Sequence, residues 1–159
     1  MSLQEIIKPD GVLCNATARS KKHCLEILSE LLTRHYEELS ATDIFECLVE
    51  RERLGCTSLN KGAAFPHCRK DGIDQSTAVL IKLSEPVDFD SADGEPVDLV
   101  IGMLLPDQVD DSHLADVQLV TEILSDEGLR ERLREMNSSR DLYNALIQGA
   151  EVTCQADCA

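Results

Sequence analysis

The sequence predicts an α/β (α+β) fold in which a mixed β-sheet is covered by helices on both faces. Apolar residues recur at helical spacing in the first and last thirds of the chain, and two runs rich in Val, Ile and Leu lie between them. A turn signal, Asp93-Gly94, falls between those runs, so the two strands should be antiparallel. This argues against a purely parallel, doubly wound sheet. A sheet of such apolar strands needs helices to cover it.

Two helices are expected before the sheet. The first begins after a cap at Ser20 and runs to about Leu39, and the second follows a capping sequence at Ser40 and continues toward Arg51. The apolar stripe of the first helix comprises Cys24, Ile27, Leu28, Leu31 and Leu32. Its histidines, His23 and His35, fit structural roles.

The centre of the chain contains a stretch without helical periodicity, followed by two apolar runs. From residue 54 to residue 69 the helical periodicity ends and glycines and a proline interrupt the sequence, which predicts a loop with one short strand at 63–65. Residues 77–83 and 97–105 are then the two apolar runs, and we expect them to form strands of a buried sheet.

Three helices are expected in the last third. They begin at Ser112, after Ser125 and after Ser138. In the first of them His113 shares a face with Val117, so it should point toward the core. Residues 151–159 show no periodicity and are expected to be a disordered tail, which leaves residues 1–150 as a single domain.

Charge and composition limit the possible functions. Fifteen Lys and Arg against thirty Asp and Glu give a formal net charge of −15, which repels nucleic acids and anionic lipid surfaces. The same acidity is also compatible with a role in solubility alone. No apolar run approaches the roughly 20 residues that cross a bilayer and no signal sequence is recognisable, so we expect a cytoplasmic protein without membrane insertion. Seven scattered cysteines fit free thiols.

His67 is the residue most suited to chemistry. Pro66 stiffens the backbone before it, Thr57 and Ser58 supply hydroxyls nearby, and Arg51 supplies a positive charge suited to phosphate oxygens. A neutral imidazole can accept a phosphoryl group without a metal or nucleotide cofactor. A surface histidine without function is the simpler interpretation of this spacing alone. A Cys-His nucleophile using the adjacent Cys68 is disfavoured, because neighbouring residues generally point apart and no orienting group is evident.

The segment Arg51-Glu-Arg-Leu-Gly-Cys-Thr-Ser-Leu-Asn-Lys-Gly-Ala-Ala-Phe-Pro-His67 resembles the active-site segment of the fructose/mannitol-type IIA proteins of the bacterial phosphotransferase system. His113 occupies the place of the family's second histidine. The opening Ile6-Ile-Lys-Pro and the phrase Ser20-Lys-Lys-His-Cys-Leu-Glu-Ile are similar to the nitrogen-regulatory branch in particular. The resemblance extends from residue 3 to about residue 150.

The resemblance implies a phosphotransferase/anion transport IIA-like fold and a phosphohistidine relay without a cofactor. A carrier protein of the HPr or NPr type would phosphorylate His67, with Arg51 and His113 stabilising the transferred phosphate and Thr57 as a further contact. The phosphorylation state would then be read by a partner such as a potassium transport protein or a sensor kinase.

The segment also departs from the family pattern. Cys56 replaces a serine, Ser58 and Asn60 replace glycines, and Cys68 stands where glycine usually follows the histidine. Two alternatives therefore remain open. One is a sugar-transport IIA component that passes phosphate to a IIB domain, and the other is a protein-binding module that is not phosphorylated.

Overall fold

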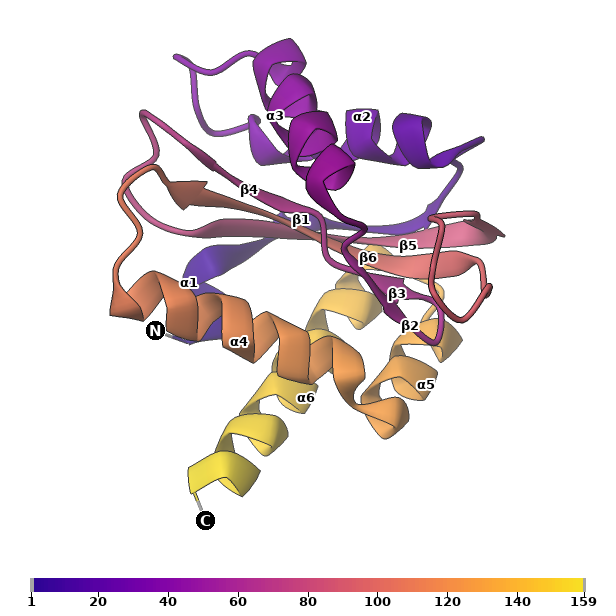
Figure 1. The fold of residues 1–159 in the computed structure, drawn as a ribbon. Coiled ribbons are helices and arrows are strands. Elements are labelled where there is room, and N and C mark those ends of the chain that lie inside the picture. The colour runs from indigo at the N-terminus through magenta and orange to yellow at the C-terminus, as the bar shows by residue number, and fades with distance from the viewer. Residues whose placement is uncertain (1, 159) are drawn as a thin grey trace.

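Helices and strands alternate in a computed structural model that describes residues 2–158, with side chains described through residue 152 (Figure 1). The elements in chain order are α1 (Leu3–Ile6), β1 (Ile7–Ala16), α2 (Lys21–Leu32), α3 (Ala41–Leu54), β2 (Ser58–Asn60), β3 (Ala63–Ala64), β4 (His67–Lys70), β5 (Thr77–Val87), β6 (Val97–Pro106), α4 (Asp111–Ser125), α5 (Glu127–Glu135) and α6 (Ser139–Cys158). Within residues 2–158, no helix combines the length and apolar character needed to cross a bilayer.

The strands form one mixed sheet of six strands in the described part of the chain, with the order β1-β5-β6-β3-β2 and β4 paired to β6. The pair β5–β6 is antiparallel, as the turn signal at residues 93–94 predicted. β1 runs parallel to β5, and both β3 and β4 run parallel to β6. The predicted mixed sheet is therefore confirmed.

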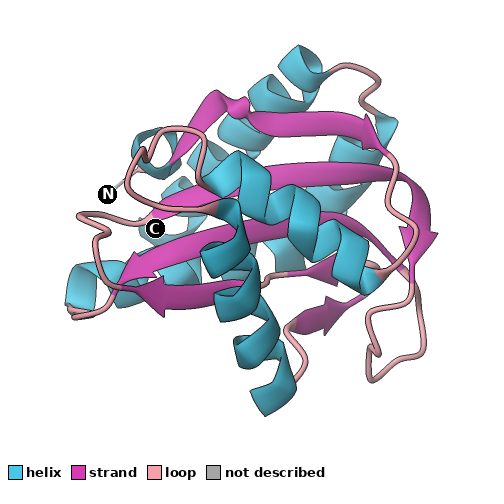
Figure 2. Ribbon diagram, turned by 90° about the horizontal axis from the view of Figure 1, so that it is seen from above, coloured by secondary structure: helices cyan, strands magenta, loops and turns pink. Residues whose placement is uncertain are grey.

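Helices cover both faces of the sheet, as expected. Figure 1 shows α2 and α3 on one face and α1, α4, α5 and α6 on the other, and Figure 2 shows the first pair crossing in front of the strands. Alternate residues of β6 pack into two separate hydrophobic cores, because successive side chains of a strand point to opposite faces of the sheet. Ile101 and Met103 pack in the core under α4 to α6, while Val100 and Leu104 pack in the core under α2 and α3.

Local signals set several helix ends. The hydroxyls of Ser20 and Ser40 accept the amide N–H groups of residues three positions later, so both predicted caps are confirmed. The helix predicted to run to Leu39 instead ends at Leu32. The chain turns there and the hydroxyl of Tyr36 bonds that of Thr77 on β5 at 2.8 Å. Residues 33–39, which the sequence assigned to the helix, are thus held by a contact with a residue far away in the sequence.

Two further helix boundaries differ from expectation. The cap of α4 is Asp110, two residues before the predicted start at Ser112, whose hydroxyl donates to the Asp110 carboxylate. α6 continues through residues 151–158, where a disordered tail was expected. This stretch contains neither glycine nor proline to end a helix.

The sequence missed β1 altogether. Pro9, Asp10 and Gly11 interrupt the strand pattern, and register irregularities separate the pairs that Ile7 and Val12 make with β5. An edge strand tolerates proline and bulges, since one side of its backbone needs no partner. The pairing with β5 therefore creates a strand that the local sequence does not signal.

Residues 54–69 are also more regular than the predicted loop. They contain β2 and β3 and the beginning of β4, and the register of β3 continues into β4, with Ala64 opposite Val100 and His67 opposite Met103. Pro66 separates the two strands because it has no N–H to donate. The prediction of a loop was wrong at residues 58–60 and at its last residues, and His67 is a strand residue.

Candidate functional site

A groove runs along the outer side of β4 and contains His67. α3 borders it on one face of the sheet, and the segment leading into α4 borders it on the other. We call it the His67 groove; it is lined by Cys47, Glu50, Arg51, Leu54, His67, Cys68, Arg69, Leu105, Asp107, Val109, Leu114 and Val117. Its position at a sheet edge leaves the imidazole half-buried rather than enclosed.

The backbone around His67 is firmly placed. The carbonyl of Pro66 accepts the amide N–H of Met103 at 3.0 Å, and the amide of Phe65 donates to the carbonyl of Thr57 at 3.0 Å. The ring of Phe65, which is 1% exposed, stacks on the imidazole with 4.4 Å between centroids. The two residues before His67 are thus fixed to other elements, and the ring has one well-defined position.

The tautomer of His67 follows from its contact with Phe65. The ring Nδ1 lies 2.6 Å from the Phe65 carbonyl oxygen. A carbonyl can only accept, so Nδ1 carries the proton and donates it. In the neutral ring the lone pair is therefore on Nε2, and this nitrogen is the nucleophile.

The environment keeps His67 neutral. Burial from water lowers the pKa of the imidazole below its ordinary value, and the positive charge of Arg51 acts in the same direction. The Phe65 carbonyl and the negative charge of Glu52 oppose this shift without reversing it. A histidine with a lowered pKa is mostly in its nucleophilic form at neutral pH.

Arg51 reaches the groove from the last turn of α3. One guanidinium nitrogen donates to the carbonyl of Gly55 at 3.0 Å, which orients the side chain toward the loop after the helix. A guanidinium carries five N–H donors, so several are available for an anion in the groove. Arg51 and His67 are thus brought together as the sequence predicted.

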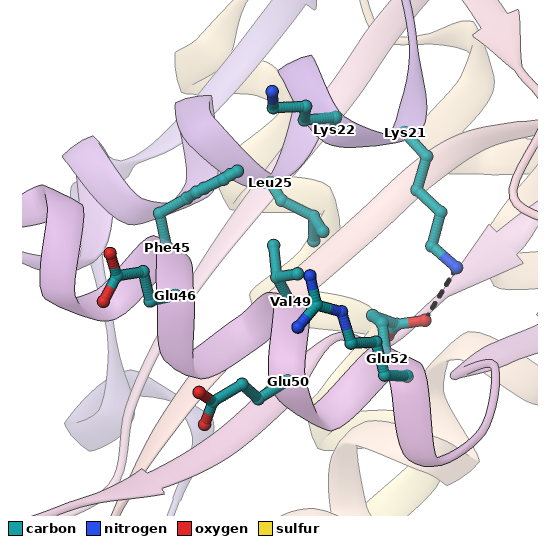
Figure 3. A pocket seen from close by; sticks show the side chains of 9 residues that line it. Lys21, Lys22, Leu25, Phe45, Glu46, Val49, Glu50 and Glu52 are labelled. Carbon is teal, nitrogen blue, oxygen red and sulfur yellow. Dashed lines mark ion pairs between the residues drawn. The ribbon is translucent and has the colours of Figure 1, made fainter.

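Thr57 is placed differently from the phosphate contact that the resemblance implied. Its side chain is 7% exposed, and its hydroxyl and amide both donate to the carboxylate of Glu52. Glu52 also pairs with Lys21 of α2 at 2.9 Å (Figure 3). These bonds fix the segment after α3, so Thr57 supports the site through the loop.

His113 lies in the first turn of α4, where it closes a capping box. Its amide donates to the Asp110 carboxylate and its Nδ1 accepts the Asp110 amide, each at 3.1 Å. Because Nδ1 accepts, the neutral ring carries its proton on Nε2 and can donate from there. Val109 and Leu114, on either side of this cap, line the His67 groove, whereas the ring of His113 is 9% exposed.

A second groove lies between α2 and α3 (Figure 3). Its side chains are Lys21, Lys22, Leu25, Phe45, Glu46, Val49, Glu50, Glu52 and Arg53. Among these described residues there is no imidazole, thiol or hydroxyl group, and the polar side chains are lysines, glutamates and one arginine. His67, Cys47 and Cys68 all line the His67 groove instead.

The sequence of this chain matches the model of a known family. Residues 5–149 match the model of the phosphoenolpyruvate-dependent sugar phosphotransferase system, EIIA 2. The chain belongs to this EIIA 2 family. The match covers the whole sheet and includes all four predicted site residues.

Relatives of this EIIA 2 protein support the nitrogen-regulatory branch. A nitrogen regulatory protein of Pseudomonas aeruginosa is 37% identical over 145 residues, which cover 91% of this chain and 94% of the relative. One of Escherichia coli is 31% identical over 147 residues, covering 92% and 90%. The crystal structure of nitrogen regulatory protein IIA-Ntr from Neisseria meningitidis has a TM-score of 0.84 at 35% identity, covering 91% and 98%.

The EIIA 2 domain also shares its fold with a sugar-specific protein. The crystal structure of IIA mannitol from Escherichia coli has a TM-score of 0.72 at 23% identity, with 86% of this chain and 96% of that chain covered. This likeness concerns the fold. The predicted fold class and branch are confirmed, whereas the roles of individual residues stay predictions.

Sequence reasoning missed two groups of site residues in this EIIA 2 domain. Phe65 sets the tautomer of His67, and the pair formed by Lys21 and Glu52 anchors the loop of Thr57. Phe65 stands two positions before His67, the spacing at which strand residues share a face, so its stacking could have been inferred had β4 been recognised. The Lys21–Glu52 pair joins two helices, and no local signal indicates it.

Proposed function

We propose that this protein is a regulatory phosphocarrier that accepts a phosphoryl group on Nε2 of His67. The donor is a phosphohistidine carrier of the HPr or NPr type, and the phosphorylation state is the signal that a partner protein reads. The observation that supports this most is the hydrogen bond from His67 Nδ1 to the Phe65 carbonyl, which leaves Nε2 as the nucleophile beside Arg51.

The chemistry needs no group that the chain does not supply. The Nε2 lone pair attacks the phosphorus of the donor's phosphohistidine, and the bond from phosphorus to the donor nitrogen breaks, returning an electron pair to the donor ring. The Nδ1–H of His67 stays bonded to the Phe65 carbonyl, which stabilises the positive character of the phosphorylated ring. Arg51 balances the charge on the equatorial oxygens, the main requirement of such a transfer.

The rim of the groove suits a protein donor. Leu54 at the end of α3 is 85% exposed, and Leu114 in the first turn of α4 is 58% exposed. Both line the His67 groove, one from each side of β4. Exposed apolar residues around a charged centre are a common form of protein-binding site. We assign these leucines to contact with the carrier.

The test is reconstitution with phosphoenolpyruvate, enzyme I and an HPr or NPr carrier, read by intact mass. Wild type should gain one phosphoryl group, and His67→Gln should gain none, since glutamine keeps a similar size without a nucleophilic nitrogen. The described chain offers His23, in α2, as a matched control, and His23→Gln should be phosphorylated like wild type. Phosphorylation of His67→Gln at the wild-type level would refute the proposal.

Arg51 provides a second readout in the same experiment. Arg51→Ala should slow acceptance by roughly 10²–10³-fold, the effect of removing one group that stabilises transition-state charge. Arg51→Lys should recover part of the rate, because it restores charge without the planar fork. Rapid onward transfer from the phosphorylated protein to a IIB domain would instead favour a sugar-transport role.

A further inference from the structure

Two cysteines meet behind the acceptor histidine. Cys47 lies on α3 and Cys68 is the second residue of β4, and both line the His67 groove. Their thiols act on each other, because Cys68 lowers the pKa of the Cys47 thiol and Cys47 raises the pKa of the Cys68 thiol. The Cys47 sulfur also donates to the carbonyl of Arg69, the residue after Cys68, at 3.3 Å. Side chains from a helix and a strand thus place two sulfur atoms together.

The two thiols have different roles in this pair. Cys68 is 7% exposed, and its S–H donates to Cys47, so its proton is held. That hydrogen bond, together with the charge of Lys70, lowers the pKa of the Cys47 thiol. Cys47 is half-buried and faces the open groove, where a small oxidant can reach it. The arrangement is an accessible nucleophilic sulfur with a second sulfur behind it.

The other thiols with described side chains are bonded or buried elsewhere. Cys14 donates to the Met136 carbonyl at 3.5 Å, and Cys56 donates to the Phe89 carbonyl at 2.9 Å. Cys24 is fully buried, and burial raises the pKa of its thiol to about 12. Among these five cysteines, only Cys47 and Cys68 therefore combine access to solvent, a lowered thiol pKa and a partner sulfur.

We propose that Cys47 and Cys68 form a peroxide-sensitive dithiol whose oxidation to a disulfide slows phosphoryl transfer to His67. The Cys47 thiolate attacks one oxygen of hydrogen peroxide, the O–O bond breaks, and the departing hydroxide takes a proton to become water. The sulfur of Cys68 then attacks the sulfenic sulfur of Cys47, and the S–O bond breaks. The hydroxide leaves with the Cys68 proton as a second water, so two thiols and one peroxide give one disulfide and two waters.

The disulfide would join the two elements that build the acceptor site. Cys47 lies one helical turn before Arg51 on α3, and Cys68 directly follows His67 on β4. A disulfide holds its sulfurs at about 2.05 Å, so we expect its formation to draw α3 toward β4. Arg51 moves with the helix, and a misplacement of about 1 Å at such a site can cost up to about 10²-fold in rate.

Disulfide formation can be tested without phosphorylation, because it depends on the cysteine geometry alone. Trypsin releases Cys47 in the peptide 35–51 and Cys68 in the peptide 62–69, and each peptide contains one cysteine. After peroxide treatment the full chain should yield these two peptides linked, and dithiothreitol should separate them. If the linked peptide does not form, the proposal is wrong.

Matched variants separate this pair from the other thiols. Cys56→Ser removes an exposed cysteine outside the pair and should still give the linked peptide. Cys47→Ser and Cys68→Ser should each abolish it, and two variants on different elements guard against one failing to fold. In each of these two variants one cysteine of the pair remains. If that cysteine becomes linked to another thiol after peroxide treatment, the oxidation is non-specific and the dithiol proposal is wrong.

The effect on transfer rests on the proposed function and needs a second measurement. Oxidised wild type should accept phosphate from the carrier about 10- to 100-fold more slowly than reduced wild type, and reduction should restore the rate. Peroxide should leave the rate of Cys47→Ser unchanged relative to the same variant untreated. Equal rates for oxidised and reduced wild type would overturn the switch. If reduced protein accepts no phosphate, the proposed function fails, while the linked peptide still stands.

Discussion

His67 illustrates how one side chain acquires a specific reactivity from its neighbours. A free imidazole has two equivalent choices for its proton, but the Phe65 carbonyl 2.6 Å from Nδ1 leaves one. Burial and Arg51 then hold the ring in its neutral form. The same residue in an unstructured peptide would have neither a defined nucleophilic nitrogen nor a lowered pKa. The tautomer and the lowered pKa of His67 are thus properties of residues 65–67 and Arg51 together.

The lowered pKa of His67 predicts the pH dependence of phosphoryl acceptance. Only the neutral ring is a nucleophile, so the rate should fall to half of its plateau only below pH 6.5, the ordinary pKa of a histidine. Protonation of an unshifted histidine would already halve the rate there. An NMR titration of the His67 ring, without the carrier, gives the midpoint directly. A midpoint at or above 6.5 would contradict the assignment.

At the scale of elements, helix packing depends on one glycine. Gly149 of α6 lies against Leu129 of α5, and a Cβ at this position would lie 2.3 Å from a Leu129 methyl carbon. Leu129 is 5% exposed and belongs to the core, so it cannot move aside without disturbing its neighbours. The glycine allows the two helices to approach.

Gly149→Ala should therefore destabilise the fold despite the helix propensity of alanine. We expect a loss of about 1–3 kcal/mol in the free energy of unfolding, the typical cost of overpacking. Gly128→Ala in α5 is the matched control, because its nearest contact would be an ordinary 3.5 Å from the Asp126 carboxylate. That control should be neutral or stabilising by up to about 1 kcal/mol. Urea denaturation measures both, and a stable Gly149→Ala would show that the helices can separate.

At the scale of the whole molecule, β6 is the centre of the sheet. β5 pairs with one of its edges, β3 and β4 pair with the other, and its side chains enter the cores on both faces. The site depends on this strand, since β4 and therefore His67 are positioned by pairing with Met103 to Pro106. The groove is thus attached to the most deeply buried part of the protein.

This organisation predicts a hierarchy of amide hydrogen exchange. The amides of Ile101 and Met103 should exchange only through global unfolding, while that of Glu5 in the four-residue helix α1 should exchange by local opening. Native-state exchange in increasing denaturant distinguishes the two modes, because only global unfolding depends strongly on denaturant. Fast, denaturant-independent exchange at Met103 would show that the site opens without the core.

Local signals account for what the sequence alone determined. The caps at Ser20 and Ser40, the antiparallel strands at 77–83 and 97–105, and the mixed sheet with helices on both faces all came from residues close together in the chain. The choice of His67 with Arg51 came from a local segment too, and it stays a prediction. A cap, a turn or an apolar run is recognisable because the residues that make it interact with near neighbours.

Tertiary structure alone decided the features whose partners are distant in sequence. β1 and β4 are strands because β5 and β6 offer them backbone hydrogen bonds, although Pro9 and Pro66 weaken their own patterns. The ion pair of Glu52 with Lys21, the end of α2 at Leu32, and the meeting of Cys47 with Cys68 likewise depend on how separate elements pack. Their physical cause is the packing of the folded chain, which no local window of the sequence contains.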